Sequence, residues 1–413
     1  MDNRKGVKMD KEFIKKAYSS VPMYIRMADR LGIDVDNIDD INELPIITKE
    51  EIMDNDSVLA SHCISLLYGK KLMEKRTSGS TGKYLNVYWK NEDYIRSMFP
   101  LWIMRKKYYD ISPDDKMCFF YTITEVENEK DSFREKNMLG FSKSKLNEDK
   151  LKEIFSQMRE FYPKWLILQP SIGLLLCQFM DRYDIKPIDS IKYIEMSGEL
   201  LTKETRQKVE KHFNCRVADQ YGAHEFNSIA YECPYGNMHI MERNVIVEVM
   251  NNGKKVQDGN EGELVITTRT NSAMPLIRYK IGDIGKICTG QCSCGSKWKM
   301  FKLTSGRVND YILSNAGERI TSYVFVRALD VINYKMDGII KQFQIIQTAI
   351  DEFRIRLIVD EAELDRCNAI SKLFKESVLD ERLCDARYIF EYGTELIPNE
   401  SNGKYAYFKR LIG

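Results

Sequence analysis

Neither sign of charge dominates this sequence of 413 residues, which has 62 basic and 61 acidic side chains. A net charge of +1 provides no field to attract a nucleic acid or an anionic membrane, so we expect neither partner and favour small-molecule chemistry. Long apolar runs are also missing, since the most apolar stretch, residues 165–180, is too short and too polar to span a bilayer. The N-terminal MDNRKGVKMDKEF has no apolar core, so we expect no secretory signal and a cytoplasmic protein.

The ten cysteines of a cytoplasmic chain argue against a disulfide framework. Four metal-binding side chains lie in two short segments that each contain a turn-forming glycine: Cys233 and His239 in ECPYGNMH, and Cys292 and Cys294 in QCSCG. Two such loops suit a structural, tetrahedral Cys₃His site for Zn²⁺. Cys288 is an alternative ligand, and a set of free thiols is the alternative interpretation.

The chain is too long for one compact core, which predicts two domains. Short apolar strands, for example residues 117–121 and 165–168, alternate with polar helices from about residue 84 to 305, and this pattern indicates an α/β layered fold. Between residues 240 and 287 the pattern becomes strand-like, with a turn at Asn251-Asn252-Gly253, and predicts a small antiparallel sheet or barrel. A β-β-α-β order follows residue 306, and a capping box is predicted where Glu51 follows Thr48 in the N-terminal helical region.

A segment rich in glycine and hydroxyl side chains, RTSGSTGK, lies at residues 76–83. Glycines let the backbone approach a phosphate, hydroxyls and N–H groups donate to its oxygens, and a lysine adds positive charge. The segment is not a Walker A loop, because only two residues separate Gly79 from Gly82 and Tyr84 follows Lys83. A mobile surface loop is the alternative. The predicted phosphate-binding residues are Thr77, Ser78, Gly79, Ser80, Thr81, Gly82 and Lys83.

Six further motifs follow in order: SGE (197–199), DQYGAHEF (219–226), GELVITT (262–268), RYKIGD (278–283), SGRVND (305–310) and NGK (402–404). With residues 76–83 they resemble the core motifs of the adenylate-forming superfamily, which contains acyl- and aryl-CoA ligases, peptide-synthetase adenylation domains and luciferases. The segments ELPIITKEEI, SIAYECPYGNMHI and CSCG make the chain most similar to phenylacetate–CoA ligases and their capsule-biosynthesis-type relatives. The resemblance covers nearly the whole chain.

The resemblance implies a large N-terminal domain of layered α/β sheets over residues 1–308, with a small β-barrel-like subdomain at about 235–300. A small, mobile α+β C-terminal domain is expected over residues 309–413. Asn309 takes the hinge position, where the family often has an aspartate.

The motif matches also imply roles for individual residues. Residues 77–83 resemble the loop that holds the β- and γ-phosphates of ATP, and Glu225 resembles the glutamate that binds Mg²⁺. Tyr221 and Gly222 are expected to flank the adenine or the acyl group, and Asp283 to accept from the ribose hydroxyls. The remaining members of the predicted nucleotide site are Gly198, Glu199, Asp219, Gln220 and Arg307.

Lys404 is the predicted catalytic cation, reaching from the C-terminal domain to the carboxylate and the α-phosphate. A solvated lysine near the C-terminus is the alternative. His224 stands where the superfamily usually has a threonine or serine whose hydroxyl touches the α-phosphate. Because an imidazole can donate to the same oxygen, His224 joins Lys404 and Glu225 among the catalytic candidates.

The expected reaction joins a carboxylic acid, aromatic or small, to ATP as an acyl-AMP with release of pyrophosphate, and then transfers the acyl group to a thiol. Coenzyme A is the expected acceptor. The phosphopantetheine of an acyl carrier protein or an amine is the alternative, and a nucleotide-binding scaffold without catalysis is the competing class. The sequence leaves open which acid is used and whether the protein is a homodimer.

Overall fold

The computed structural model describes residues 11–53, 58–76, 85–121, 131–142, 146, 148–305, 342–378, 383, 385–394 and 407–412, with short stretches between 311 and 340. The chain divides into two compact parts, which are described separately. Unit 1 contains residues 1–115, 195–198 and 218–304, and unit 2 contains residues 116–194, 199–217 and 305–413. Within the described ranges, no helix is long and apolar enough to cross a membrane.

The helices of unit 1 begin and end where the local sequence favours it. Pro22 opens the second helix at a position where its missing N–H costs nothing, and Gly32 ends that helix with a φ of 64°. The predicted capping box is confirmed, because Thr48 N–H donates to the Glu51 carboxylate at 2.8 Å and Glu51 N–H donates to Thr48 Oγ1 at 3.3 Å. These helices are α1 (Lys11–Ser20), α2 (Pro22–Leu31), η1 (Ile41–Glu43), α3 (Lys49–Met53), η2 (Ser61–Cys63), α4 (Ile64–Tyr68) and α5 (Asn91–Tyr109).

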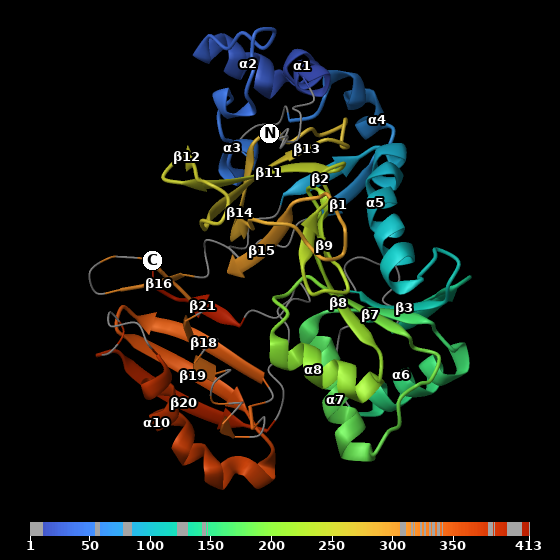
Figure 1. Cartoon of the computed structure of the whole chain (residues 1–413), viewed down its shortest axis with the longest axis vertical. Coiled ribbons are helices and arrows are strands. Elements are labelled where there is room, and N and C mark those ends of the chain that lie inside the picture. The colour runs from blue at the N-terminus through green and yellow to red at the C-terminus, as the bar shows by residue number, and fades with distance from the viewer. Residues whose placement is uncertain are drawn as a thin grey trace. The chain divides into compact units, whose positions relative to one another are not determined.

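A series of neighbouring strands, most of them paired antiparallel, forms the large sheet of unit 1 (Figure 1). Its order is β12–β11–β13–β14–β15–β10–β9–β8, and a separate antiparallel pair joins β1 to β2. The turn between β11 and β12 places Asn252 and Gly253 at φ values of 48° and 74°, as the predicted Asn-Gly hairpin requires. The strands are β1 (Met73–Arg76), β2 (Asn86–Trp89), β8 (Arg216–Ala223), β9 (Asn227–Glu232), β10 (Met238–Ile240), β11 (Val245–Asn251), β12 (Lys254–Lys255), β13 (Gly262–Thr268), β14 (Tyr279–Ile287) and β15 (Met300–Ser305).

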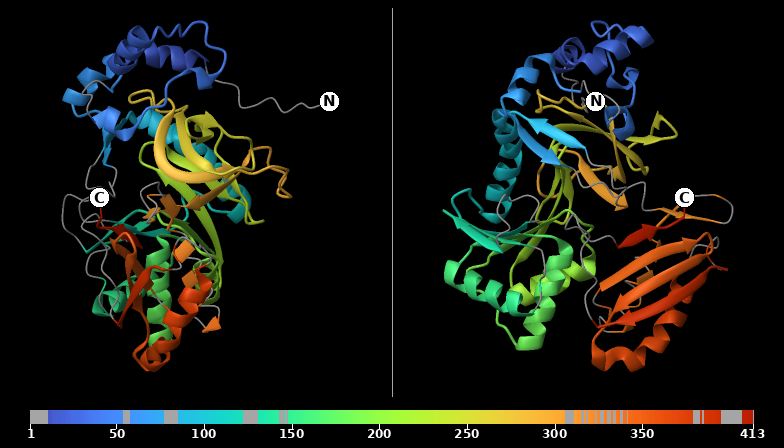
Figure 2. Two further views of the ribbon diagram at one scale, coloured as in Figure 1. Left: turned by 90° about the vertical axis from the view of Figure 1, so that its left-hand side faces the viewer. Right: turned by 180° about the vertical axis from the view of Figure 1, so that it is seen from behind.

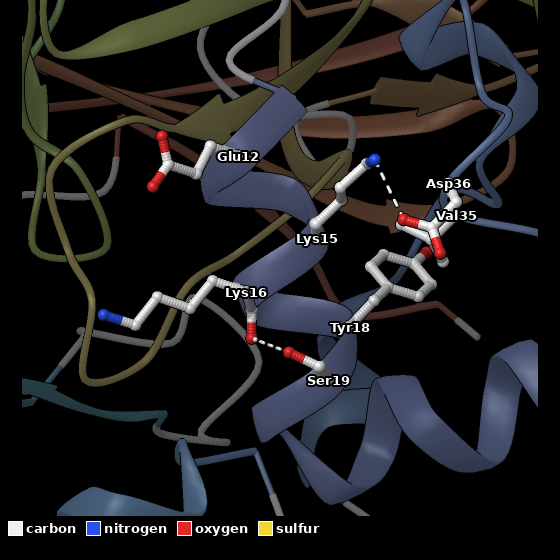
Figure 3. Close-up of a pocket in the computed structure, with 7 residues that line it drawn as sticks. All are labelled: Glu12, Lys15, Lys16, Tyr18, Ser19, Val35 and Asp36. Atoms are coloured by element: carbon white, nitrogen blue, oxygen red, sulfur yellow. Dashed lines mark hydrogen bonds and ion pairs between the residues drawn. The ribbon is translucent and has the colours of Figure 1, made fainter.

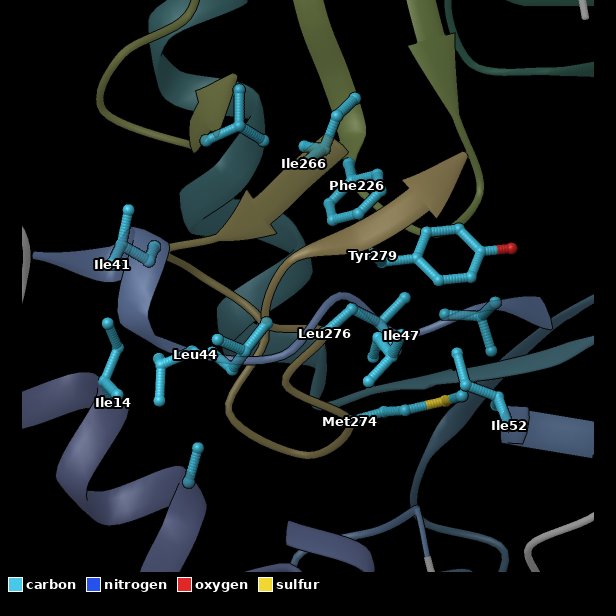
Figure 4. Packing of buried hydrophobic residues seen from close by; sticks show 14 of the residues in the cluster. Ile14, Ile41, Leu44, Ile47, Ile52, Phe226, Ile266, Met274, Leu276 and Tyr279 are labelled. Carbon is cyan, nitrogen blue, oxygen red and sulfur yellow. The ribbon is translucent and has the colours of Figure 1, made fainter. Parts of the chain in front are cut away.

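The main hydrophobic core of unit 1 joins the N-terminal segment to the antiparallel strands (Figure 4). Ile47 is fully buried and forms a parallel bridge to Tyr279, the first residue of β14. Ile47 N–H donates to the carbonyl of Arg278 at 3.0 Å, and Lys280 N–H donates back to the carbonyl of Ile47 at 2.9 Å. The ELPI segment is therefore held against the strand that carries the RYKIGD motif.

The first strands of unit 2 follow the order β6–β3–β5–β4, in which β4 alone is antiparallel to its neighbour. The predicted strands 117–121 and 165–168 coincide with β3 and β6. The elements are β3 (Met117–Tyr121), β4 (Ser132–Glu135), β5 (Met138–Ser142), α6 (Glu148–Phe161), β6 (Trp165–Leu168), α7 (Pro170–Tyr183) and α8 (Lys203–Phe213), while β7 (Tyr193–Ser197) contains residues of both units.

The C-terminal part of unit 2 is a four-stranded sheet of order β20–β19–β18–β21 (Figure 2). Phe353 and Ile355 of strand β19 and Phe374 of helix α10 belong to one buried hydrophobic cluster. The helix and the sheet therefore share a core. The α/β fold class is confirmed; the boundary predicted between residues 308 and 309 falls outside the described residues and stays a prediction. The elements are β16 (Tyr311–Leu313), β17 (Arg319–Thr321), β18 (Gln342–Ala349), β19 (Glu352–Ile358), η4 (Glu361–Cys367), α10 (Asn368–Ser377), β20 (Arg387–Gly393) and β21 (Phe408–Arg410).

Candidate functional site

The YGAHE motif forms the tight hairpin between β8 and β9. A Cβ atom on Gly222 would collide with the backbone oxygen of Asn227, so the hairpin accepts only glycine at this position. Asn227 itself has a φ of 64°, which asparagine tolerates. The turn carries the His224 carbonyl to within 3.0 Å of the Trp89 indole N–H, which donates to it, and buries Glu225 to 7% exposure. Two of the three predicted catalytic residues, His224 and Glu225, therefore lie on a fixed turn rather than on a loose loop.

Tyr221 and Asp283 come together although they belong to different motifs. The phenol of Tyr221 on β8 donates a hydrogen bond to Asp283 Oδ2 on β14 at 2.5 Å. The Tyr221 ring also stacks on Phe301 of β15, with ring centroids 5.5 Å apart and an angle of 16° between planes. Gly282, beside the aspartate, has a φ of 91°, a conformation that favours glycine. The arrangement fixes one carboxylate and one aromatic ring side by side, which suits binding of a ribose and a planar base.

The SGE motif follows β7, and a buried ion pair holds the end of that strand. Gly198 turns the chain with a φ of 84°. Three residues earlier, Glu195 accepts from Arg105 of α5 at 2.8 Å and 2.5 Å, in a two-point contact between side chains that are almost fully buried. The Arg105 guanidinium also lies over the Trp102 ring at 4.5 Å. Gly198 belongs to unit 1 and the next motif residue, Glu199, to unit 2. The position of each is therefore described only within its own unit.

Arg278, the first residue of RYKIGD, anchors the strand that carries Asp283. It adopts a φ of 51° and is 3% exposed. Its guanidinium donates to the buried Glu248 carboxylate at 3.2 Å and 3.1 Å, and to the carbonyls of Asn42, at 3.0 Å, and Leu44. One side chain therefore joins β11, β14 and the N-terminal segment.

Of the other predicted nucleotide-site residues, Asp219 and Gln220 lie on β8, and Asp219 N–H donates to Glu232 on β9 at 2.7 Å. The structure does not describe the predicted phosphate-binding loop, nor the residues predicted at the hinge and in the C-terminal domain. Thr77, Ser78, Gly79, Ser80, Thr81, Gly82, Lys83, Arg307, Asn309 and Lys404 lie outside the described residues, so their roles remain predictions.

The two cysteine loops meet in unit 1. Sulfur atoms of Cys233 and Cys292 lie 3.7 Å apart, Cys294 Sγ lies 3.2 Å from His239 Nε2, and the ligand atoms of all four residues lie within 4.8 Å of one another. Cys288 is not part of this group. Both loops turn at glycines with positive φ, Gly236 and Gly295, as the sequence predicts.

Hydrogen bonds with neighbouring groups orient three of the four side chains. His239 Nδ1 lies 3.1 Å from the carbonyl oxygen of Trp298, so Nδ1 carries the proton and Nε2 is left as the ligand atom. The Asn237 amide donates to Cys292 Sγ at 3.3 Å, and the Tyr108 phenol of α5 donates to Cys294 Sγ at 3.6 Å. These donors stabilise thiolates rather than thiols.

The two thiols of the Cys233–Cys292 pair differ in acidity. Burial raises the pKa of the Cys233 thiol to about 12. Burial also opposes ionisation of Cys292, but hydrogen bonds from the Cys294 N–H, the Cys294 thiol and the Asn237 amide outweigh it and lower the pKa of Cys292 to about 6. A bound cation would favour the thiolate at both positions.

The geometry of this group fits a tetrahedral Zn²⁺ ion. Zinc–sulfur bonds of about 2.3 Å at tetrahedral angles place two sulfurs about 3.8 Å apart, close to the separation of Cys233 and Cys292. Three of the four ligands are buried, and Cys294 is partly exposed. A closed set of four protein ligands is typical of a structural site.

A surface pocket in unit 1 is lined by residues of α1 and of the segment that follows α2 (Figure 3). It has a volume of about 470 Å³, is lined by Glu12, Lys15, Lys16, Tyr18, Ser19, Val35 and Asp36, and contains no predicted site residue. Lys15 Nζ and Asp36 Oδ1 form an ion pair across it at 2.9 Å. Because the Lys15 ammonium and the Asp36 carboxylate neutralise each other, this pair gives no sign of a ligand-binding site.

The sequence did not point to Arg105, Glu195 or the role of Arg278. Each is a charged residue inside an otherwise ordinary helix or strand, and a sequence shows charge without showing burial. These residues are buried because segments that are distant in the sequence pack together, and the residues next to each of them in the sequence do not indicate this packing. Tyr108 was missed for the same reason, because nothing in α5 links it to the cysteine loops.

Comparisons with known proteins show what the chain as a whole is similar to. The family model for the CapK C-terminal domain matches residues 312–410. Phenylacetate-coenzyme A ligase of Escherichia coli K12 is 25% identical over 322 residues, which cover 73% of this chain and 70% of that protein. Protein CapK of Staphylococcus aureus is 26% identical over 341 residues, covering 81% of this chain and 72% of that protein.

A solved structure extends the similarity to the fold of nearly the whole chain. A 2-hydroxyisobutyryl-CoA ligase in its postadenylation state, in complex with 2-HIB-AMP, superposes with a TM-score of 0.74 at 16% identity. The match covers 96% of this chain and 87% of that protein. At this identity the match shows the fold, in agreement with the α/β class expected from the sequence.

Proposed function

Because its sequence and fold place the chain in the adenylate-forming superfamily, on the branch of the phenylacetate–CoA ligases and CapK, we propose that it activates a carboxylic acid with ATP and transfers the acyl group to coenzyme A. In the first step a carboxylate oxygen bonds to the α-phosphorus and the bond to the β-phosphate oxygen breaks, which releases pyrophosphate. In the second step the thiolate attacks the acyl carbon and AMP leaves. The first acids to test are aromatic or small organic acids.

The observation that best supports the proposal is the contact between Tyr221 and Asp283. Two motifs that lie far apart in the sequence supply the two atoms of one hydrogen bond at 2.5 Å. We assign the ribose hydroxyls to Asp283, because a carboxylate can accept from both, and the adenine to the ring of Tyr221. The phenol holds the carboxylate in one orientation, so this side of the site is preorganised.

The buried turn after β8 supplies the next set of roles. We assign Glu225 to an Mg²⁺ ion bound with the phosphates, because the ion is hard and prefers carboxylate and phosphate oxygens. The ion neutralises developing charge on the phosphates when bound. His224 is placed next to it on the same turn, where a ring N–H suits donation to the α-phosphate.

Four predicted elements outside the described residues complete the proposal. Residues 77–83 would hold the β- and γ-phosphates, and Lys404 would supply the positive charge at the attacking carboxylate. Arg307 would assist at the ribose, and Asn309 would act as a hinge between a core over 1–308 and a C-terminal domain over 309–413. The two half-reactions would then use different positions of the smaller domain.

We also propose that Cys233, His239, Cys292 and Cys294 bind one structural Zn²⁺. Their donor set, their separations and the hydrogen bonds around them support this assignment. The ion would fix the loop before β10 to the loop before β15, and so stabilise the strands that carry Phe301 beside Tyr221. No chemical step is assigned to it.

Pyrophosphate release from MgATP across a panel of aryl and alkyl carboxylates tests the proposal. We expect release that depends on one class of acid, and AMP formation at full turnover only when coenzyme A is added. If a carrier-protein thiol is the acceptor, pyrophosphate release will appear without stimulation by coenzyme A. No acid-dependent release with any member of the panel would favour a nucleotide-binding scaffold.

A further inference from the structure

Helix α5 exposes a continuous apolar ridge. Ile95, Phe99 and Ile103 are 52%, 60% and 50% exposed, and they are spaced four residues apart. Side chains at this spacing form one ridge along a helix, here about 12 Å from the first to the last at 1.5 Å per residue. Single exposed apolar side chains are common on proteins, but a row of three is unusual.

The opposite face of α5 already has its partner. Ser97, Leu101 and Met104 are buried, and the helix packs against β9. The helix is thus fixed in unit 1 by one face, and the ridge is the other face. Figure 1 shows α5 as a long helix at the border of the strands of unit 1.

Charges at the two ends of the ridge have opposite signs. Glu92 lies in the first turn of α5, and Lys106 and Lys107 lie in the last turn. All three are exposed. Lys106 pairs with Asp110 on its own helix, and the Lys107 ammonium lies 5.1 Å from the centre of the Tyr108 ring. The ridge is therefore acidic at one end, apolar in the middle and basic at the other.

Such a ridge is complementary to itself when one copy is turned by 180°. A two-fold axis through Phe99 places Ile95 opposite Ile103 of the other copy, and Phe99 opposite Phe99. The same operation brings Glu92 to the end of the partner helix that carries Lys106 and Lys107. Isologous contacts in homodimers have this symmetry, and ridges at four-residue spacing interdigitate in the commonest class of helix packing.

We propose that the α5 ridge is a homodimer contact in which two copies of this chain pack antiparallel about Phe99. The sequence alone left the homodimer open, and the geometry of α5 supplies its surface. The contact is independent of the assigned reaction. One helix ridge with its neighbours buries less than the roughly 1,200–2,000 Å² of a stable standard interface, so we expect association in the micromolar range.

The first test measures the dissociation constant by analytical ultracentrifugation of the full chain from about 1 to 200 µM. Phe99→Glu places two like charges on the two-fold axis and should weaken the dimer by at least ~30-fold, the loss typical of a central interface residue. Tyr68→Glu is the matched control, because Tyr68 is an exposed aromatic with 83% exposure on a different helix, α4, and is not part of the ridge. It should leave the dissociation constant unchanged.

The second test determines the orientation of the two helices. Glu92→Lys alone, and Lys107→Glu alone, should each weaken the dimer by about threefold to fivefold at low salt, since both place like charges opposite each other. The double variant restores opposite charges and should return to the wild-type constant.

The outcomes separate clearly. A wild-type chain that is monomeric across the whole range overturns the proposal, and so does a Phe99→Glu chain that dimerises like the wild type. Equal losses in Tyr68→Glu and Phe99→Glu would assign the effect to general surface charge and also overturn it. Failure of the charge-swapped double variant to recover would overturn the antiparallel arrangement. Circular dichroism and the melting temperature confirm that each variant is folded.

Discussion

The phenol of Tyr221 and the carboxylate of Asp283 are joined by a hydrogen bond of 2.5 Å across strands β8 and β14. The two residues are separated by a β-rich stretch of the sequence that contains Cys233 and His239. Tyr221 is further held by stacking on Phe301. The pair therefore reports whether the antiparallel strands of unit 1 are correctly assembled as well as where a nucleotide would bind.

Substitution of Asp283 and substitution of Tyr221 should each lower kcat/KM for ATP, the first more than the second. Asp283→Ala should lower kcat/KM for ATP by about 10²-fold, because two hydrogen bonds to the ribose are lost. Tyr221→Phe keeps the ring and the carboxylate, so we expect a loss of about fivefold, mainly in KM. Steady-state pyrophosphate release at varied ATP measures both.

Asp258→Ala is a suitable control, since its carboxylate forms a surface ion pair with Lys299 at 3.3 Å. This variant should behave like the wild type. Unchanged ATP kinetics in Asp283→Ala would remove the ribose assignment, whatever the other variants do.

Metal analysis tests the cysteine and histidine group directly. We expect about one zinc per chain in protein produced with sufficient zinc, and loss of that zinc in Cys292→Ser, because a four-ligand structural site tolerates no missing thiolate. Loss of the ion should lower the melting temperature more than it changes the rate of the adenylation step.

Cys288→Ser provides the matched control for that measurement. Cys288 lies close in sequence but outside the group of four, so its replacement should leave the zinc content unchanged. Zinc-free wild-type protein would contradict the assignment, and equal zinc loss in both serine variants would mean that Cys288 is a ligand.

Local signals in the sequence predicted much of the fold. Short apolar runs located β3 and β6, Asn252-Gly253 marked a hairpin, and the Thr48–Glu51 capping box formed as expected. These features depend on neighbours within a few residues. The meeting of the cysteine loops was also predicted, because Cys and His at short spacing on turn-bearing loops have few other uses.

Contacts that depend on distant parts of the chain could not be predicted. Arg278 looks like a surface residue of a strand, yet it is buried with a positive φ and holds the N-terminal segment. Arg105 and Glu195 look equally ordinary in sequence. Burial of a charge is decided by the strand or helix that packs over it, and no pattern within one element records that.

The Arg278–Glu248 pair should be important for stability. Glu248→Gln leaves the Arg278 charge buried without its counter-charge, which typically costs about 3–5 kcal/mol in the free energy of unfolding. Glu263→Gln is the comparison, because Glu263 pairs with Lys280 at 2.7 Å with both side chains about one-third exposed. Its loss should cost less than about 1 kcal/mol. Urea unfolding measures both, and equal small losses would contradict the role given to Arg278.

Lys404→Ala should slow formation of acyl-AMP by about 10²–10³-fold, the usual cost of losing one group that stabilises transition-state charge. Binding of ATP should change little, because the lysine is expected to act mainly on the transition state. Thioester formation from acyl-AMP supplied ready-made should suffer much less, since the smaller domain is expected to move between the two steps.

Single-turnover assays of the two half-reactions separate these effects. Lys409→Ala, a neighbouring lysine on β21, is the control and should retain both activities. Equal losses in both half-reactions of Lys404→Ala, or full adenylation activity, would leave Lys404 as a solvated surface lysine.

The central claim is that a carboxylate oxygen attacks the α-phosphate of ATP, and isotope transfer tests it most directly. The reaction is run with an ¹⁸O-labelled carboxylate that supports pyrophosphate release, together with MgATP and coenzyme A, and the products are analysed by mass spectrometry. The account predicts that AMP carries one ¹⁸O atom from the acid and that pyrophosphate carries none. Label in orthophosphate with formation of ADP, or unlabelled AMP, would contradict it.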